Sequence, residues 1–276
     1  MNGTIAAAAL AAGLAAAGVG GATAQERPPP PRPQSALALD MESADWETSA
    51  RAVGEALRIR AAERGPALRR ALIGALEAQG MPDAPRAPSY EAGADYVDAL
   101  LDAVLEMRDP ASIPALVRSP TFGAPVATAL ADFGPRALPA ALEAATSPDS
   151  REFLVSSALM TLRIMVEEWG GPAALSPERR AELAAAAALY LNGPGEAYAE
   201  LTADSGWRVG IVVRRAMGLA AVLGDSGLRS RLEEIAADAS VAEALGVTSD
   251  GSAARTQAEA AALLAGTPPL PRPKRW

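Results

Sequence analysis

A short pattern occurs twice in the middle of the chain, at residues 109–116 and at residues 134–142. In both runs a turn-forming residue precedes a proline. An aliphatic residue, a second proline and another aliphatic residue follow at matching steps, the last displaced by one position, and the offset between the runs is 25 residues, from 109 to 134. Proline is tolerated in the first turn of a helix, because the amide hydrogen that it lacks has no intrahelical partner there. Each run therefore predicts the start of a helix.

The segment between the two runs also has the pattern of a helix. Residues 124–134 are mostly apolar and end at Gly134, a residue that commonly terminates helices. A helix pair that recurs in one chain is typical of a helical solenoid, in which each unit buries its apolar face on its neighbours. We therefore expect an all-α fold, an α-solenoid of stacked antiparallel helix pairs, with an irregular N-terminal pair left open.

These motifs resemble HEAT repeats, in particular the short proline-containing repeats of phycobiliprotein lyases. The resemblance is carried by Asp-Pro-x-x-Ile-Pro-x-Leu at residues 109–116 and by Ala-Leu-x-x-Phe-Gly-Pro at residues 129–135, with a looser echo at residues 219–232. The offset of 25 is shorter than the ~40 residues of a full HEAT unit. The resemblance implies an armadillo-like stack of helix pairs that binds proteins, and it implies no catalytic chemistry.

Apolar residues at steps of three and four predict helices in most of the remaining chain. The helix over residues 151–168 is apolar on more than one face, so we expect it to be central, with neighbours on both sides. Capping residues and breakers set the other boundaries. The further helices predicted are a segment from about residue 43 with Ser43 or Asp45 as cap, then 68–80, 92–107, 179–191 with Ser176 as cap, 207–223, 228–237 and 253–264.

The first 24 residues have the features of a secretory signal peptide. An apolar run ends in Ala22-Thr23-Ala24, the small-x-small pattern that signal peptidase requires, which predicts cleavage between Ala24 and Gln25. The run has no Lys or Arg before it, so retention as an anchor is the alternative, although its Gly and Ala content would make the anchor weak. We therefore expect a periplasmic or secreted protein that is not stably inserted in the membrane after cleavage.

Composition divides the rest of the chain into three parts. Residues 25–40 are expected to be a Pro-rich linker, residues 41–265 the HEAT-like helical repeat domain, and residues 266–276 a disordered Pro-rich basic tail. The linker contains a polyproline stretch at residues 26–33, which is interpreted as a spacer, with a ligand for SH3-like domains as the alternative.

The residue types present exclude several classes of chemistry. The formal net charge of −8 disfavours a nucleic-acid partner, whose binding needs clustered Lys and Arg. The chain contains no His and no Cys, so Ser-His-Asp and Cys-His arrangements and the usual zinc hydrolase sites cannot be built. We expect no cofactor and no metal. A pair of carboxylates, as in glycoside hydrolysis, is the catalytic arrangement that remains.

Two groups of charged residues are candidate binding sites. Asp95, Asp98 and Asp102 form an acidic stripe on one predicted helix, interpreted as a solvated face, with a cation or basic-partner site as the alternative. Arg208 and Arg215 share a face of the helix over residues 207–223. Ion pairing between repeats is the ordinary explanation for them, and an anion site shared with Trp207 is the alternative.

A third group of charges surrounds the helix break at Gly65-Pro66. It is interpreted as a solvated rim, with a contact surface for anions as the alternative; its members are Arg58, Arg60, Arg64, Arg69 and Arg70.

Two functional hypotheses follow from these observations. The first is a non-catalytic exported HEAT-like protein that acts as an interaction scaffold for a protein partner in the periplasm or cell envelope. The second is a carboxylate-dependent, glycan-directed hydrolase on a helical scaffold, which would use available Asp and Glu side chains such as Asp95, Asp98 and Asp102.

Overall fold

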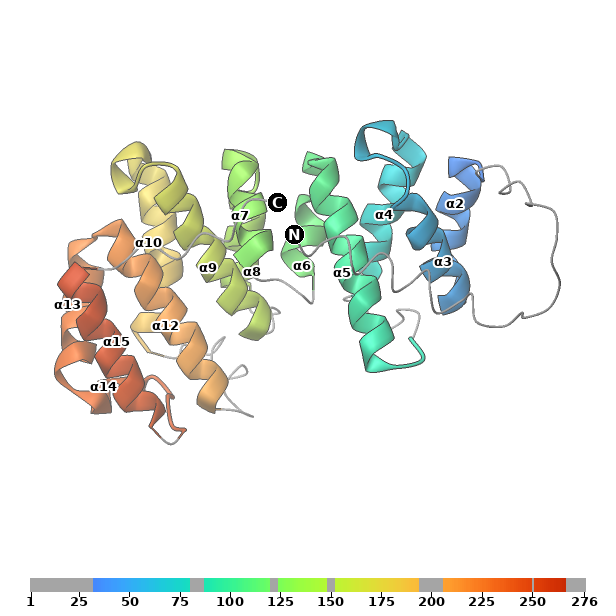
Figure 1. Ribbon diagram of the computed structural model, residues 1–276. Helices are drawn as coiled ribbons and strands as arrows, with labels where there is room; N and C mark the ends of the chain where they lie inside the picture. Colours follow the sequence, from blue (N-terminus) through green and yellow to red (C-terminus); the bar gives the residue numbers. More distant parts are fainter. Residues whose placement is uncertain are drawn as a thin grey trace. The chain divides into compact units, whose positions relative to one another are not determined.

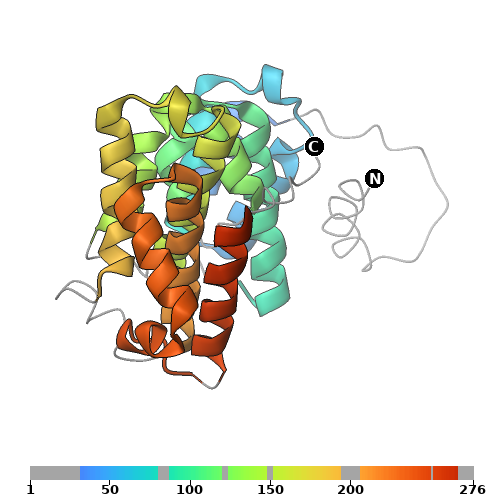
Figure 2. The ribbon, with the colours of Figure 1, turned by 90° about the vertical axis from the view of Figure 1, so that its left-hand side faces the viewer.

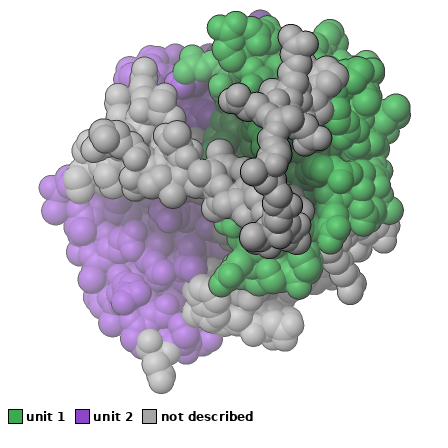
Figure 3. Space-filling view, turned by 45° about the vertical axis from the view of Figure 1, so that its right-hand side comes forward, with its two compact units in different colours: residues 1–121 green, residues 122–276 purple. Residues whose placement is uncertain are grey.

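The computed structural model describes residues 32–79, 87–119, 124–147, 152–193, 206–249 and 251–266. Every regular element within these ranges is a helix and none is a strand, which confirms the all-α class. The chain divides into two compact units, residues 1–121 and 122–276 (Figure 3), where the sequence predicts a single repeat domain over residues 41–265.

The described part of the first unit has five α-helices, in which helices two apart along the chain are neighbours. Helix α4 contacts α2 and α6, and α3 contacts α5, in addition to the contacts of α2 with α3 and of α4 with α5. The elements are α2 (Gln34–Met41), α3 (Trp46–Ala56), the 3₁₀ turn η1 (Ala61–Glu63), α4 (Pro66–Ala78), α5 (Tyr90–Met107), the turn η2 (Pro110–Ser112) and α6 (Ile113–Arg118).

Helix α2 corrects the predicted linker boundary. Residues 34–40 form part of this helix, which buries Leu37 and Met41 in its contacts with α3 and α4. The Pro-rich composition ends at Pro33, which is the N-cap of α2. With only two buried apolar residues and no side-chain cap, α2 has little helical signal in its sequence. The predicted signal peptide and residues 25–31 lie outside the described ranges.

The second unit has two rows of helices. In the α9 row, α7, α9, α12 and α15 contact one another in succession, and in the α10 row, α8, α10 and α13 do the same (Figures 1 and 2). The elements are α7 (Ala124–Asp132), the turn η3 (Gly134–Arg136), α8 (Leu138–Thr146), α9 (Glu152–Glu168), the turn η4 (Pro172–Ala174), α10 (Pro177–Leu191), α12 (Gly206–Leu223), α13 (Ser226–Ala237), α14 (Ala239–Ala244) and α15 (Ser252–Gly266).

The two repeated sequence runs form the same local structure. In each, the first proline lies in a 3₁₀ turn and the second lies in the first turn of the α-helix that follows, Pro110 and Pro114 in one and Pro135 and Pro139 in the other. The amide that proline lacks is unpaired at these positions in any helix. The prediction of two matching helix starts is therefore confirmed.

Capping side chains begin several of the predicted helices. Asp45 accepts a hydrogen bond from the Thr48 amide at the start of α3, and Ser176 accepts one from the Arg179 amide at the start of α10. Each supplies an acceptor to an amide that has no partner in the first turn. The prediction of Ser176 as a cap is confirmed, and of the two candidates for α3 the structure selects Asp45.

Helix α9 is the centre of the second unit, as its apolar faces predict. It contacts α7 and α8 on one side and α10 and α12 on the other. Five of its large apolar side chains are completely enclosed: Val155, Leu159, Leu162, Met165 and Val166.

The C-terminal part contains one helix that the sequence patterns did not predict. Helix α14 has six residues, and Asp238 caps it by accepting from the Ser240 amide. The predicted tail begins at Gly266, which is the last residue of α15, and residues 267–276 lie outside the described ranges. None of the helices within those ranges is both long enough and apolar enough to span a membrane.

Candidate functional site

The acidic stripe lies on the exposed side of α5. Asp95, Asp98 and Asp102 are exposed, whereas Leu100 and Val104 on the other side of the helix are fully buried. Partial burial, together with the charges of Asp98 and Glu106, raises the pKa of the Asp102 carboxyl. The described residues include no group of three or more acidic side chains that could hold a metal ion. The stripe spreads its carboxylates along one straight helix, whereas hydrolysis needs two carboxyls facing each other across a cleft.

The arginines around the Gly65-Pro66 break do not form a uniform solvated rim. Arg58, Arg60 and Arg70 are exposed, as the prediction requires, but Arg64 is 3 % exposed and Arg69 is half-buried. A charged side chain is buried only when it has partners, because leaving water is costly. The interpretation as a rim is therefore wrong for Arg64.

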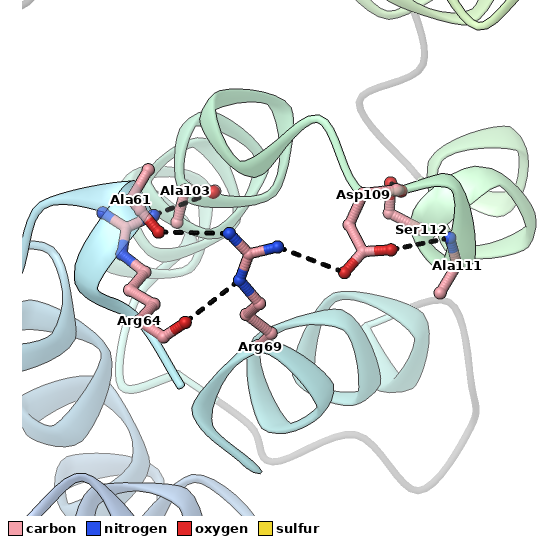
Figure 4. A network of polar contacts seen from close by, with 7 residues as sticks. All are labelled: Ala61, Arg64, Arg69, Ala103, Asp109, Ala111 and Ser112. Carbon is pink, nitrogen blue, oxygen red and sulfur yellow. Dashed lines mark hydrogen bonds and ion pairs between the residues drawn. The ribbon is translucent and has the colours of Figure 1, made fainter. Parts of the chain in front are cut away.

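The guanidinium of Arg64 joins the α3–α4 connection to the C-terminal end of α5 (Figure 4). Its Nε donates to the carbonyl of Ile59 at 3.0 Å. Its Nη1 donates to the carbonyl of Ala103 at 3.0 Å. Its Nη2 pairs with the Glu106 carboxylate at 2.8 Å. A cation near the C-terminal end of a helix is favourable, because the helix dipole is negative there. Arg64 therefore places its charge against the last turns of α5 and ties the α3–α4 connection to that helix.

A second arginine extends this network toward α6. Arg69 donates from Nε to the carbonyl of Arg64 at 3.0 Å and pairs with the Asp109 carboxylate at 3.5 Å, and that carboxylate also accepts from the Ala111 amide (Figure 4). The side chains of this network and Arg70 line an open hollow of about 370 Å³. Since Arg64 and Arg69 use their donors within the protein, the network is suited to holding α4, α5 and α6 together.

The remaining candidate residues, predicted as an anion site, lie on α12, in the second unit. Trp207 and Arg208 belong to this helix, but their side chains lie outside the described part of the structure. Arg215 is half-buried, and its pKa is lowered by burial and by the charge of Arg163, while the charge of Glu259 raises it. The structure thus brings Arg215 together with charged residues that the sequence patterns did not single out.

Arg163 of α9 and Arg214 of α12 were not predicted from the sequence. Arg163 is 8 % exposed, and its Nε pairs with Glu167 at 2.8 Å. Arg214 pairs with Glu259 of α15 at 3.4 Å, and burial lowers its pKa. We refer to Arg163, Arg214 and Arg215 with Glu167 and Glu259 as the α9–α12–α15 charge cluster.

Two glycines of α12 are the sequence feature that indicates close contacts at this position. Gly210 and Gly218 stand inside the apolar helix α12, where glycine is less stable than alanine. A Cβ at Gly218 would lie 2.9 Å from Nη1 of Arg163, and one at Gly210 would lie 3.1 Å from Nη1 of Arg214. Gly218 therefore makes room for a guanidinium against the helix, and Gly210 makes room for the Ser252 hydroxyl, at 2.9 Å, as well as for a guanidinium.

Comparison with known proteins identifies no relative of this chain. No family model, curated protein or solved structure matches the chain. The resemblance to HEAT repeats therefore rests on the motifs of residues 109–145.

Proposed function

We propose that this chain is a non-catalytic, exported helical-repeat protein that binds another protein of the periplasm or cell envelope along the exposed side of its α9 row. The proposal combines three expectations: a solenoid fold, a leader that directs export, and a surface that serves as an interaction scaffold. Each of them has separate support in the sequence or in the packing.

The alternation of helix contacts is the observation that carries the proposal. In the second unit, α9 contacts α7 and α12, and α10 contacts α8 and α13, so that helices from alternate positions in the chain lie next to each other. The first unit has the same alternation through α2, α4 and α6. Stacked helix pairs of a solenoid pack in this way, each pair covering the apolar face of the next. Such stacks leave an extended surface free for partners.

The residue inventory supports binding in preference to catalysis. The chain contains no His and no Cys. The acidic stripe is an exposed helix face, and Arg64 and Arg69 of the first unit are occupied by carbonyls and carboxylates of the same unit. The small-x-small pattern that ends at Ala24 supports export.

Site-specific photo-cross-linking in the source cells tests the proposal. A benzophenone amino acid is placed at Ala258, which is exposed on α15 between Arg255 and Glu259, and as a control at Ala185, which is exposed on α10 of the other row. We expect a discrete protein adduct from Ala258 and none from Ala185. The absence of adducts at both positions, or an adduct at Ala185 alone, contradicts the proposal.

A further inference from the structure

Helix α12 is built to hold guanidinium groups on the side that faces α9 and α15. Arg163 crosses from α9 to lie against Gly218, and Arg214 lies against Gly210 on its own helix while its Nε pairs with Glu259 of α15. Glycine destabilises a helix interior, so an alanine at either position would favour the helix itself. Gly218 is therefore best explained by the arginine that it accommodates, and Gly210 by the close approach of Ser252, Arg214 and Val247 together.

The charges of the α9–α12–α15 cluster are not balanced. It holds three arginines and two glutamates, and a further arginine on α15, Arg255, is close enough to lower the pKa of Arg214. Glu167 pairs with Arg163, and Glu259 pairs with Arg214 while its charge also acts on Arg215. In a chain with a formal net charge of −8, this face is locally cationic.

Arg215 is the arginine of the cluster whose guanidinium N–H groups have no acceptor among the described residues. It forms no hydrogen bond or ion pair with any other described residue, although it is half-buried. Burial lowers its pKa in spite of the nearby Glu259, which means that the unit compensates this charge incompletely. A guanidinium in such a place can gain from a carboxylate that it pairs with through two parallel hydrogen bonds.

Half-buried apolar residues lie on the same side of α12 as Arg215. Ile211 precedes it by four residues and Val222 follows it by seven, spacings that keep all three on one helix face. Both are partly accessible. This face therefore offers a cation between two apolar contacts.

We propose that the face of α9, α12 and α15 around Arg215 binds an acidic segment of a partner protein. A carboxylate of that segment pairs with the Arg215 guanidinium, and neighbouring aliphatic side chains of the segment contact Ile211 and Val222. This inference rests on the proposed function, because it names the class of partner that the α9 row takes.

A peptide fits this face better than a polyanion does. The guanidinium of Arg163 is already paired with the carboxylate of Glu167, and that of Arg214 with the carboxylate of Glu259. This face therefore already accommodates carboxylates beside its guanidiniums. Nucleic acids and anionic bilayers are bound through many cations at once. The net charge of −8 opposes such binding, whereas one short segment needs only the local excess of arginine.

Fluorescence anisotropy with a synthetic peptide tests the inference on the full chain. The probe is a fluorescein-labelled decapeptide in which Glu and Leu alternate, and the control probe has Gln in place of every Glu. We expect the Glu peptide alone to bind, with an affinity that falls as salt is raised. Arg215→Gln is expected to weaken binding about tenfold, the effect of losing one charge-assisted hydrogen-bonded pair.

Matched variants separate binding from folding. Arg229→Gln removes an exposed arginine that pairs with Glu233 on α13, outside the α9 row, and is expected to leave the affinity unchanged. Glu259→Gln removes the carboxylate that competes for Arg214 and Arg215 and is expected to tighten binding, a gain that misfolding cannot produce.

Three results would overturn the inference: no binding of the Glu peptide, equal binding by Arg215→Gln, or tighter binding to phosphatidylglycerol vesicles or polyphosphate than to the peptide. If cross-links at Ala258 persist in any of these cases, the proposed function stands and the acidic partner alone is rejected.

Discussion

The guanidinium of Arg163 on α9 lies directly against Gly218 on α12, so that a Cβ at that glycine would stand 2.9 Å from Nη1 and 3.3 Å from Cδ of the arginine. Both distances are shorter than ordinary van der Waals contact. The same arginine is 8 % exposed and pairs with Glu167 at 2.8 Å. Two neighbouring helices of the α9 row are therefore joined by a buried cation in a space that only glycine leaves open.

Gly218→Ala is expected to destabilise the second unit by about 1 kcal/mol, since displacing a buried, paired arginine outweighs the helix propensity gained. Gly74→Ala is the control: a Cβ added at this exposed glycine of α4 would meet nothing within 4 Å, and the substitution should stabilise by about 0.5–1 kcal/mol. Urea unfolding followed by circular dichroism measures both. Equal gains in stability for the two variants would contradict the role assigned to Gly218.

Arg64→Met is expected to cost about 1–3 kcal/mol, because it leaves the carbonyl of Ile59 without its donor and removes the second donor from the buried carbonyl of Ala103. Glu106→Gln should cost less than about 1 kcal/mol, because the Glu106 side chain is 57 % exposed and its ion pair is screened by water. Thermal unfolding compares the two variants. A larger loss for Glu106→Gln would show that the ion pair, not the carbonyls, holds Arg64 in place.

The raised pKa of Asp102 gives a pH dependence with a definite sign. The folded state binds this proton more tightly than the unfolded state, so the contribution of Asp102 to stability falls as pH rises from the ordinary carboxyl pKa to the raised value. Asp102→Asn should therefore stabilise the protein at pH 7 by less than about 1 kcal/mol, the effect being limited by exposure, and the difference should vanish near pH ~3.

Glu91→Gln provides the control for that measurement. Glu91 lies in the first turn of the same helix, where a negative charge is favourable, so its removal should lower stability slightly at pH 7. Urea midpoints at the two pH values measure both effects. A loss of stability for Asp102→Asn at pH 7 would contradict the account of the stripe.

Tyr190→Phe is expected to cost about 1–2 kcal/mol, because the hydroxyl of this buried α10 residue donates to the carbonyl of Ala145 on α8. Burial raises the pKa of Tyr190 to about 12. Ultraviolet titration of the folded protein should therefore lose a phenolate transition near pH 12 in the variant, whereas exposed Tyr90→Phe should leave that transition intact. Loss of a transition near the ordinary value of about 10 would place Tyr190 in contact with water.

Sequence reasoning predicted the helices well, because their signals are local. The paired prolines at residues 110 and 114, the Ser176 cap and the apolar faces of α9 each specify a short segment, and all three are found. Helix α2 was missed because its burial of Leu37 and Met41 depends on contacts with α3 and α4, which no local pattern reveals. Its neighbouring prolines also favoured a linker.

The charged sites were harder to predict because a partner for a buried charge comes from elsewhere in the chain. Arg64 finds its carbonyl acceptor at Ala103, 39 residues away, and Arg214 finds Glu259 on another helix. Position on a helix face correctly placed Asp95, Asp98 and Asp102 in solvent. The glycines of α12 were the usable signal for the arginine cluster, since glycine inside an apolar helix needs an explanation.

The stacking of helices in rows is the claim on which the scaffold proposal depends, and native-state hydrogen exchange tests it most directly. In a stack, each helix is held by its neighbours alone, so opening free energies should fall from the central helix toward the end of the row. We predict that the slowest amides of α9 have a higher opening free energy than those of α15. The same opening free energy for the slowest amides of both helices would instead indicate one cooperative globule and contradict the account.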